Sequence, residues 1–450
     1  MQIAYHDDMK RRKKAREQCG VRLQARRAAN KESGNMRKST LFASTAALLV
    51  AGLVAAQPAK ADCGIEKGSV RILSNDFEAL RLVGAEAETC ASATVKVSMN
   101  QTTEHKNLQV PALKINPAEY TVAVIANNSI VPLLNEGLLR PLDDLVAKYG
   151  QDLQPTQLIK LDGKVMAIAF MGNSQHLFFR KDILEKAGLQ PPKSYEDVLA
   201  AAKVIKEKGL MDYPLAASDK AGWDLAAEFV NMYLGYGGEL FAPGSAAAAI
   251  NNEKGLATLA TMKAMTEYMN PDYMTYNADE IIKVYVAGKA AIVNGWGSLA
   301  SGVIDPAKTP AEIANNTVLA AAPTVGGGST PAGALWWDGF SIAKNISDED
   351  AEASFRAMVY AIRPEVGQQN PNLATWLTKD YKPGPVAVGV LETATGGAKP
   401  YPMMPYMGLL HSALGSELAE FMQGRESAEE ALKDVEASYS AAAREGGFLK

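Results

Sequence analysis

Short polar side chains that follow predicted strands are the residues best placed to hydrogen-bond a polar small molecule. Amide and carboxylate groups can donate to and accept from hydroxyl groups when they project from neighbouring strand ends. Asn and Asp are also common in turns, where they bond to the local backbone, so each one alone is a weak indication. The candidates of this kind are Asn75, Asp76, Asn127, Asn128, Asn173, Gln175 and His176.

The residues that other chemistries require are missing from the sequence. It contains no Gly-x-Ser-x-Gly, His-Glu-x-x-His or Cys-x-x-Cys motif, and only His105, His176 and His411 follow residue 61. The glycines at 326–328 lack the lysine that reaches phosphate groups in a phosphate-binding loop. We therefore expect no metal site and no cofactor, and no catalytic residues unless the fold brings two carboxylates together as in a glycosidase.

The elements that would position the polar side chains alternate between strand and helix. Ser194 with Asp197 three residues later is a capping box, and Gly209 ends the helix that it starts. Ser347 and Ser427 start two further helices in the same way. The alternation predicts an α/β fold with doubly wound parallel sheets covered by helices on both faces. The predicted strands span 70–74, 93–99, 120–126, 165–170 and 177–179.

Length and charge narrow the class of protein. The chain has 450 residues, of which 47% are hydrophobic and 21% charged, as in a globular protein with two lobes or up to three domains. Residues 1–61 hold 13 of the 46 Lys and Arg but only 4 of the 50 Asp and Glu. The remainder has 33 basic and 46 acidic residues, a net charge of −13. A body this acidic disfavours nucleic acid as a partner.

The N-terminal segment has the pattern of an export signal. A basic start at 36–38, a short apolar run at 41–56 and the Ala59-Lys60-Ala61 site are typical of a signal peptide, and the run is too short to span a bilayer. We interpret 1–35 as a non-native extension, and expect a soluble periplasmic protein. Cleavage after residue 61 leaves Cys63 and Cys90, an even number in an oxidising compartment, and we predict that they form a disulfide; two free buried thiols are the alternative.

Five segments in a fixed order resemble the extracellular solute-binding proteins of carbohydrate ABC transporters, the maltose-binding-protein-like group. The similarity covers nearly the whole chain after residue 61. The segments are 128–145, 162–165, 178–197 (which resembles the hinge strand and the following helix), 288–296 with 322–323, and 431–434.

The resemblance implies two α/β lobes joined by a hinge, as in type II periplasmic binding proteins. By similarity, residues 62–177 and 324–368 form the N-terminal lobe, and residues 178–323 and 369–450 form the C-terminal lobe. Such a protein closes around a small neutral carbohydrate or polyol and is then read by the ABC permease subunits in the inner membrane. We expect a monomer that binds without turnover.

The resemblance also assigns roles to particular residues. Asn75, Asp76, Asn128 and Asn173 align with positions that contact sugar in the group, and Trp296 resembles its stacking aromatic residue. An indole can cover the C–H face of a pyranose while its hydroxyls bond elsewhere. Trp336, Trp337 and Asp338 stand where the group commonly has small residues, so they either narrow the site or pack inside. Tyr401 and Tyr406 lie in a segment like the late cleft loop of the group, where ordinary packing is the alternative.

Two other functions are compatible with the sequence. A secreted glycoside-active enzyme would use Asp76 or Asp338 with a second carboxylate. A binding protein for a charged solute, such as a polyamine or a sulfonated sugar, would use Asp338 and Asp76, or Arg180, as counterions.

Overall fold

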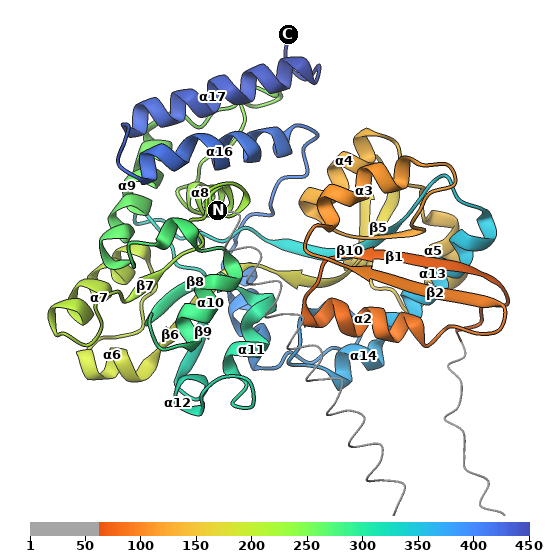
Figure 1. The fold of residues 1–450 in the computed structure, drawn as a ribbon, viewed down its shortest axis with the longest axis horizontal. Helices are drawn as coiled ribbons and strands as arrows, with labels where there is room; N and C mark the ends of the chain where they lie inside the picture. Colours follow the sequence, from red (N-terminus) through yellow and green to blue (C-terminus); the bar gives the residue numbers. More distant parts are fainter. Residues whose placement is uncertain (1–62) are drawn as a thin grey trace, which may run out of the picture. The chain divides into compact units, whose positions relative to one another are not determined.

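The computed structural model describes residues 63–450, which build two β-sheets with helices on both faces of each sheet (Figure 1). The predicted extension at 1–35 and the signal peptide at 36–61 lie outside the described residues. The α/β fold class is confirmed. The predicted strands are all present, with ends that differ by up to three residues from the expected ones.

The first sheet has the strand order β11-β5-β10-β3-β1-β2, and β4 pairs with the same edge of β5 as β11 does. β1 runs parallel to β2 and β3, whereas β10 runs antiparallel to β3 and β5. Its strands are β1 (Gly68–Ser74), β2 (Val95–Gln101), β3 (Val122–Ala126), β4 (Leu158–Leu161), β5 (Lys164–Asn173), β10 (Trp336–Ile342) and β11 (Thr375–Trp376).

The second sheet has the order β7-β8-β6-β9, in which β7 and β8 are parallel and β6 is antiparallel to both of its neighbours. The prediction of parallel sheets is therefore wrong in part, because both sheets are mixed. Two consecutive strands become parallel neighbours when the chain crosses over within one sheet. The chain instead enters β10 of the first sheet from β9 of the second, and β10 runs antiparallel to its neighbours. The strands of this sheet are β6 (Gln175–Arg180), β7 (Leu215–Ala216), β8 (Ile292–Trp296) and β9 (Thr317–Ala320).

The first sheet is covered on both faces because its strands alternate between two apolar clusters. In β3, Val122 and Val124 face one cluster, and Ala123 and Ile125 face the other. The Val124 side packs against α2 (Glu78–Glu88) and α13 (Asp348–Ala361), with α5 (Asp143–Tyr149) beside them. The Ile125 side packs against α3 (His105–Lys114) and α4 (Asn127–Asn135).

The second sheet has the same alternation. Leu177 and Phe179 of β6 face one cluster, and Phe178 between them faces another. The helices on the Phe179 side are α6 (Lys181–Ala187), α7 (Tyr195–Glu207), α8 (Trp223–Gly235), α9 (Glu253–Met265), α16 (Met407–Met422) and α17 (Ala428–Glu445). Those on the Phe178 side are α10 (Ala278–Val286), α11 (Ala300–Ile304) and α12 (Ala311–Ala314).

The three helix starts read from the sequence are present. The side chain of Ser194 accepts a hydrogen bond from the backbone N–H of Asp197 before α7, and Ser427 makes the same contact with Glu430 before α17. Ser347 caps α13 in the same way. Each cap satisfies a backbone donor that would otherwise have no partner at the helix end.

The chain passes between the two sheets at Ser174, which separates β5 from β6, and again between β9 and β10. It returns after β11, because α16 and α17 pack in the cluster of the second sheet. The two remaining α-helices of residues 63–450 are α14 (Pro364–Gln369) before β11 and α15 (Val388–Thr395) after it. β11 pairs with β5 of the first sheet although it lies beyond residue 368; the lobe boundaries given above stay a prediction.

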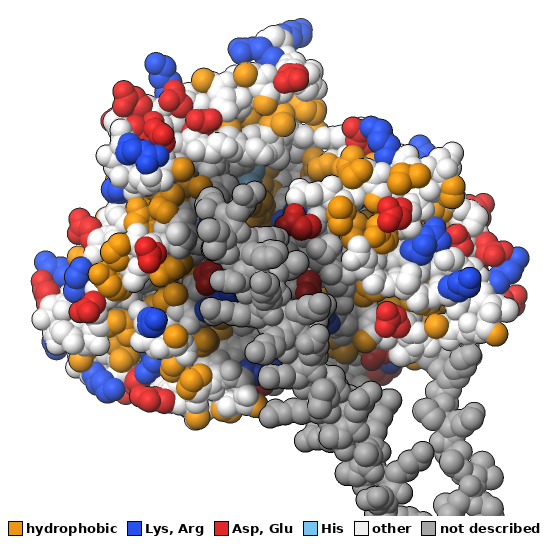
Figure 2. Space-filling view, in the orientation of Figure 1, with side chains coloured by type: hydrophobic (Ala, Val, Ile, Leu, Met, Phe, Trp, Pro, Cys, Tyr) orange, Lys and Arg blue, Asp and Glu red, His pale blue; other side chains and the backbone are white. Residues whose placement is uncertain are grey.

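Cys63 and Cys90 form a disulfide that ties the first described residue to the end of α2. The predicted pairing is confirmed. Among residues 63–450, no helix combines the length and the apolar character that crossing a bilayer requires. On the face drawn in Figure 2, acidic and basic side chains of the described residues are interspersed, without a large patch of either charge.

Candidate ligand-binding site

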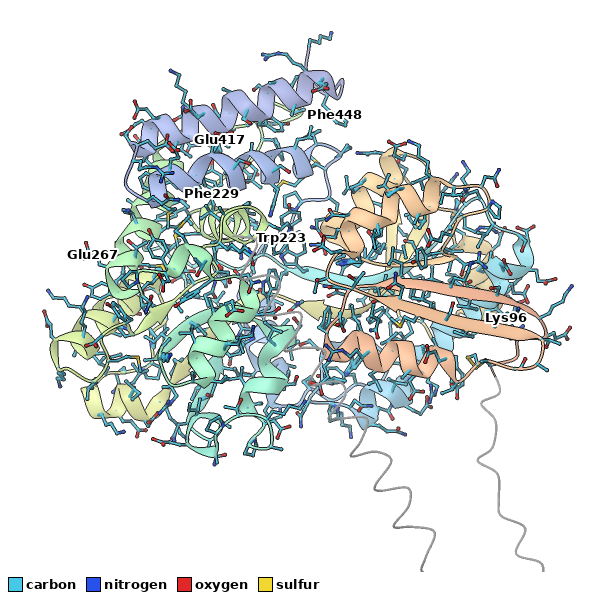
Figure 3. The ribbon with its side chains drawn as sticks, in the orientation of Figure 1. Lys96, Trp223, Phe229, Glu267, Glu417 and Phe448 are labelled. Atoms are coloured by element: carbon cyan, nitrogen blue, oxygen red, sulfur yellow. A yellow bond between two sulfur atoms is a disulfide. The ribbon has the colours of Figure 1, made fainter. Side chains whose placement is uncertain are left out.

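Three indole rings meet where elements of the two sheets come together. Trp336 is the first residue of β10 in the first sheet, Trp296 is the last residue of β8 in the second, and Trp223 begins α8. Their ring centroids are separated by 5.6 Å (Trp296–Trp336), 5.8 Å (Trp223–Trp336) and 6.0 Å (Trp223–Trp296). Rings at these spacings attract one another and form an apolar platform. We call these three residues the indole cluster; Figure 3 labels Trp223.

Tyr401 and His411 contact the indole cluster through their rings and through hydrogen bonds. The Tyr401 ring stacks on Trp336 with centroids 4.1 Å apart. Its hydroxyl lies 3.0 Å from Nδ1 of His411, and Nε2 of His411 lies 3.0 Å from the carbonyl oxygen of Trp223. Since a carbonyl only accepts, Nε2 donates the proton and Nδ1 accepts from Tyr401. Burial lowers the pKa of His411 to about 4, so the imidazole is neutral.

Lys106 of α3 places an ammonium group on this platform. Its Nζ lies 4.3 Å from the centroid of the Trp223 ring, within the range of a cation–π contact. Desolvation of the ammonium lowers the pKa of Lys106 to about 8, although the carboxyl groups of Asp338 and Asp224 favour the charged form. The residue as a whole is exposed.

Adjacent residues of β10 face opposite sides of the first sheet. Trp336 and Asp338 share one face by the two-residue period of a strand, and Trp337 points to the other. The Trp337 ring packs with the apolar cluster that α3 and α4 cover. The structure thus brings Trp336 and Asp338 to the indole cluster and directs Trp337 into packing.

Asn127 and Asn128 at the start of α4 differ in how their amides are used. Asn127 is buried, accepts from the backbone N–H of Trp337 at 2.8 Å, and donates to the carbonyl oxygens of Leu335 and Tyr401. It thereby fixes the chain segments that carry Trp336 and Tyr401. Asn128 instead has a buried Oδ1 without a hydrogen-bond partner among the described residues.

The predicted residues around Ser174 lie inside β5 and β6 rather than in a loop. The amides of Asn173 and Gln175 bond to the protein, whereas Nε2 of His176 is buried without a hydrogen-bond partner among the described residues. Asn173 donates to Ser298 Oγ at 3.1 Å and accepts from two backbone N–H groups. Gln175 donates to Glu228 at 2.8 Å and accepts from Asn231 and Asn294. His176 is fully buried and stacks on Phe178. Burial lowers its pKa to about 4.

The remaining predicted site residues have partners outside the indole cluster. Asn75 accepts from the backbone N–H of Asp76, and Asp76 forms an exposed ion pair with Arg81 at 2.7 Å. Tyr406 packs its ring against Phe241 and donates to a backbone carbonyl.

Several buried polar atoms in the indole cluster and in the segments that carry it or bond to it have no hydrogen-bond partner among residues 63–450. They include two donors, the indole N–H groups of Trp223 and Trp336, and two acceptors, the Oδ1 atoms of Asn128 and Asn294. A buried polar atom without a partner is costly, and native proteins satisfy nearly all of them with protein, water or ligand. This set could bond to a hydroxylated molecule that rests on the rings.

Comparison with known proteins identifies the family of this chain. A family model described as bacterial extracellular solute-binding protein matches residues 109–368. The chain belongs to this family. The curated relatives of this solute-binding protein match over short stretches. An uncharacterized ABC transporter extracellular-binding protein of Pyrococcus horikoshii is 30% identical over 82 residues, 18% of this chain and 20% of the relative. The sn-glycerol-3-phosphate-binding periplasmic protein UgpB of Agrobacterium fabrum is 27% identical over 117 residues, 24% and 27% of the two chains.

Solved structures confirm the two-lobed fold over nearly their whole length. Maltose-bound MalE3 of T. maritima superimposes with a TM-score of 0.70 at 17% identity, covering 83% of this chain and 99% of that one. A solute-binding protein of Agrobacterium radiobacter K84 in complex with ribitol gives a TM-score of 0.71 at 20% identity, with coverage of 83% and 98%. One from Agrobacterium vitis S4 with D-mannitol gives 0.70 at 19%, with coverage of 85% and 100%.

The solute-binding protein also buries carboxyl groups beside the indole cluster, which the sequence analysis did not identify. Burial raises the pKa of Asp219 to about 7 and that of Glu228 to about 8. Glu228 lies on α8, the helix that Trp223 begins, and accepts from Gln175. The lysine of α3 and the histidine of α16 at this site were missed as well, because no local pattern marks them as ligand contacts.

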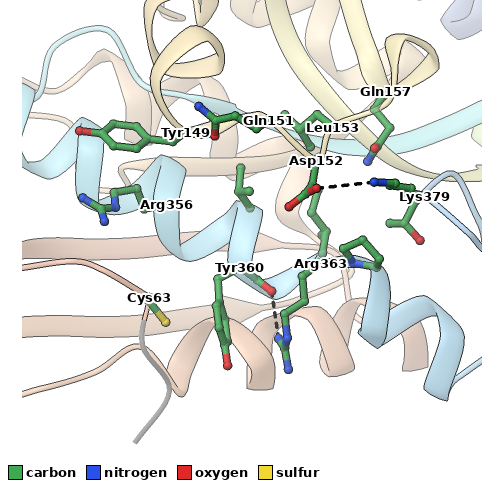
Figure 4. A pocket seen from close by; sticks show the side chains of 14 residues that line it. Cys63, Tyr149, Gln151, Asp152, Leu153, Gln157, Arg356, Tyr360, Arg363 and Lys379 are labelled. Carbon is green, nitrogen blue, oxygen red and sulfur yellow. Dashed lines mark hydrogen bonds and ion pairs between the residues drawn. The ribbon is translucent and has the colours of Figure 1, made fainter.

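A cavity of about 290 Å³ lies apart from the indole cluster, beside the disulfide and α13 (Figure 4). It contains none of the polar or aromatic residues predicted to bind ligand. Its basic side chains already have partners: Arg363 pairs with Glu86 at 2.8 Å, Arg356 with Glu352 at 3.3 Å, and Lys379 with Asp152 at 4.0 Å. The predicted site residues therefore make the indole cluster, rather than this cavity, the candidate ligand-binding site.

Proposed function

We propose that this solute-binding protein captures a small sugar or polyol at the indole cluster and delivers it to an ABC permease in the inner membrane. The protein acts in the periplasm without chemical turnover. Its two lobes, with the boundaries predicted from the sequence, close on the ligand. Closure requires that the ligand bind the closed form better than the open one, so contacts from both lobes are essential.

The observation that carries this proposal is the composition of the site. Trp336 from the first sheet and Trp296 from the second supply apolar rings, and the unpartnered Asn128 and Asn294 oxygens supply acceptors. Apolar faces with adjacent hydrogen-bonding groups match the C–H faces and hydroxyls of carbohydrates. The maltose, ribitol and mannitol named for the structural neighbours support this ligand class.

The test is a ligand panel applied to the protein beginning at residue 62. Thermal unfolding with maltose, ribitol, mannitol and common hexoses should show a higher Tm with at least one compound, because saturation at a hundredfold over Kd stabilises by about 2.7 kcal/mol. Small-angle scattering with that compound should show a smaller radius of gyration. A panel in which no sugar or polyol changes Tm would contradict the proposal, and catalytic cleavage of a bound glycoside would contradict the absence of turnover.

A further inference from the structure

The ammonium of Lys106 occupies the face of Trp223 as a ligand cation would. It stands 4.3 Å from the ring centroid and reaches that ring from α3, which packs on the first sheet, whereas α8 packs in the cluster of the second. The residue is exposed, and no salt bridge to it is found among the described residues. A single cation–π contact is a modest interaction, so a ligand cation that makes further contacts can displace this flexible side chain.

The titratable groups around this ammonium are mostly carboxyl groups, and burial raises the pKa of Asp338 to about 7. Asp338 of β10 and Asp224 of α8 act directly on Lys106, and the buried Asp219 and Glu228 act on Asp224 or on each other. Among residues 63–450, the only other cation that acts on these acids is the exposed Lys220. His411 and His105 are neutral, since burial lowers the pKa of each to about 4. A displaced Lys106 would therefore leave an aromatic face and acidic groups without a cation.

We infer that the ligand is an aminated sugar or aminated polyol whose protonated amine takes the place of Lys106 on Trp223. The ring face and the carboxyl groups of Asp338 and Asp224 recognise the ammonium. The hydroxylated remainder reaches the Trp336 N–H and the Asn128 and Asn294 oxygens. This inference rests on the proposed function and narrows its ligand class.

Matched pairs of compounds that differ only in the amine test the inference. Suitable pairs are glucose with glucosamine, galactose with galactosamine, and sorbitol with 1-amino-1-deoxysorbitol, each measured by thermal shift and calorimetry at pH 7. The aminated member of at least one pair should bind about tenfold more tightly than its neutral partner. Neutral members that bind as well or better would overturn this inference alone. If neither the neutral nor the aminated compounds bind, the carbohydrate proposal falls with it.

Variants test whether the amine of the ligand competes with Lys106. Lys106→Met removes the competing ammonium, so the ratio of aminated to neutral affinity should rise about tenfold over the wild type. Lys96→Met is the matched control, because Lys96 is an exposed lysine of β2 far from Trp223 in Figure 3, and its ratio should stay at the wild-type value. Trp223→Leu should reduce the ratio about tenfold, with circular dichroism to verify folding. A ratio that falls in Lys106→Met would show that Lys106 itself holds the ligand and would overturn the inference.

Discussion

The β5–β6 crossing and the indole cluster both carry polar groups near the junction of the two sheets, and they use these groups in opposite ways. At the crossing, the amides of Asn173 and Gln175 bond to neighbouring protein groups through both oxygen and nitrogen. In the indole cluster, the N–H groups of Trp223 and Trp336 are buried and have no partner among the described residues.

The difference teaches that residue type alone does not identify a ligand contact. Asn127 and Asn128 are identical in type and adjacent in sequence. Asn127 forms hydrogen bonds with three backbone groups, whereas Oδ1 of Asn128 has no partner among the described residues. What separates the two is the hydrogen-bonding capacity that remains after folding. The crossing should therefore govern stability, and the indole cluster should govern affinity.

The largest effect is expected from Gln175→Leu. The substitution leaves Glu228, Asn231 and Asn294 without their shared partner inside the protein, so the free energy of unfolding should fall by about 2–4 kcal/mol. Urea unfolding followed by circular dichroism measures it. Gln151→Leu, an exposed control, should change stability by less than about 0.5 kcal/mol. Unchanged stability together with lost binding would place Gln175 on the ligand instead.

Trp296→Leu should lower the affinity for the best sugar of the ligand panel about thirtyfold, because an aromatic anchor of a binding site contributes about 2 kcal/mol. Trp376→Leu is the matched control. Trp376 is equally buried, but its indole N–H donates to the carbonyl oxygen of Asn370 and its ring packs in the core of the first sheet. That variant should lose stability and keep its affinity. Equal affinity losses in the two variants would remove the distinction between site and core.

The features that local sequence predicted are those that local contacts determine. The Ser194 and Ser427 caps depend on residues three positions away, and the strand spans depend on apolar runs. Strand direction was predicted wrongly because β10 arrives from the other sheet, and nothing near Trp336 in sequence records that origin. The disulfide followed from the even count of cysteines after the cleavage site.

The site could be predicted only in part. Trp296 was identified through its resemblance to a stacking aromatic residue, and Trp336 through an unusual sequence at a strand start. Trp223, Lys106 and His411 could not be found, because α8, α3 and α16 are far apart in the chain and meet only after folding. The role of Asn173 was ambiguous for the same reason, since its partner Ser298 lies on a distant segment.

The pH dependence of stability should reveal Glu228, the buried carboxyl group that accepts a hydrogen bond from Gln175 at the β5–β6 crossing. The pKa of Glu228 is raised in the folded state to about 8 from an ordinary value near 4.5. The folded protein therefore binds a proton that the unfolded chain releases, and stability falls as pH rises from about 4.5 to about 8, by at most about 1.4 kcal/mol per pH unit. Urea unfolding between pH 5 and 8.5 measures this slope.

Glu228→Gln should flatten this slope, since the amide stays neutral throughout. The variant should match the wild type near pH 5 and exceed its stability at pH 8. Glu267→Gln, at an exposed position labelled in Figure 3, should keep the wild-type slope. A slope that Glu228→Gln leaves unchanged would assign the pH dependence to other groups, of which the raised pKa of Asp219 makes that carboxyl the first to test.

The smallest effect is expected from Asp76→Asn, although Asp76 follows a strand as a ligand-binding residue would. Its carboxylate is exposed and already pairs with Arg81, and exposed ion pairs contribute about 0–1 kcal/mol. Affinity for the best sugar should stay within about twofold of the wild type, and stability within about 0.5 kcal/mol. Arg81→Gln should have the same small effect on stability, because it breaks the same pair. An affinity loss in Asp76→Asn that Arg81→Gln does not reproduce would place Asp76 on the ligand in the closed form, and the site would then extend from the indole cluster to the end of β1.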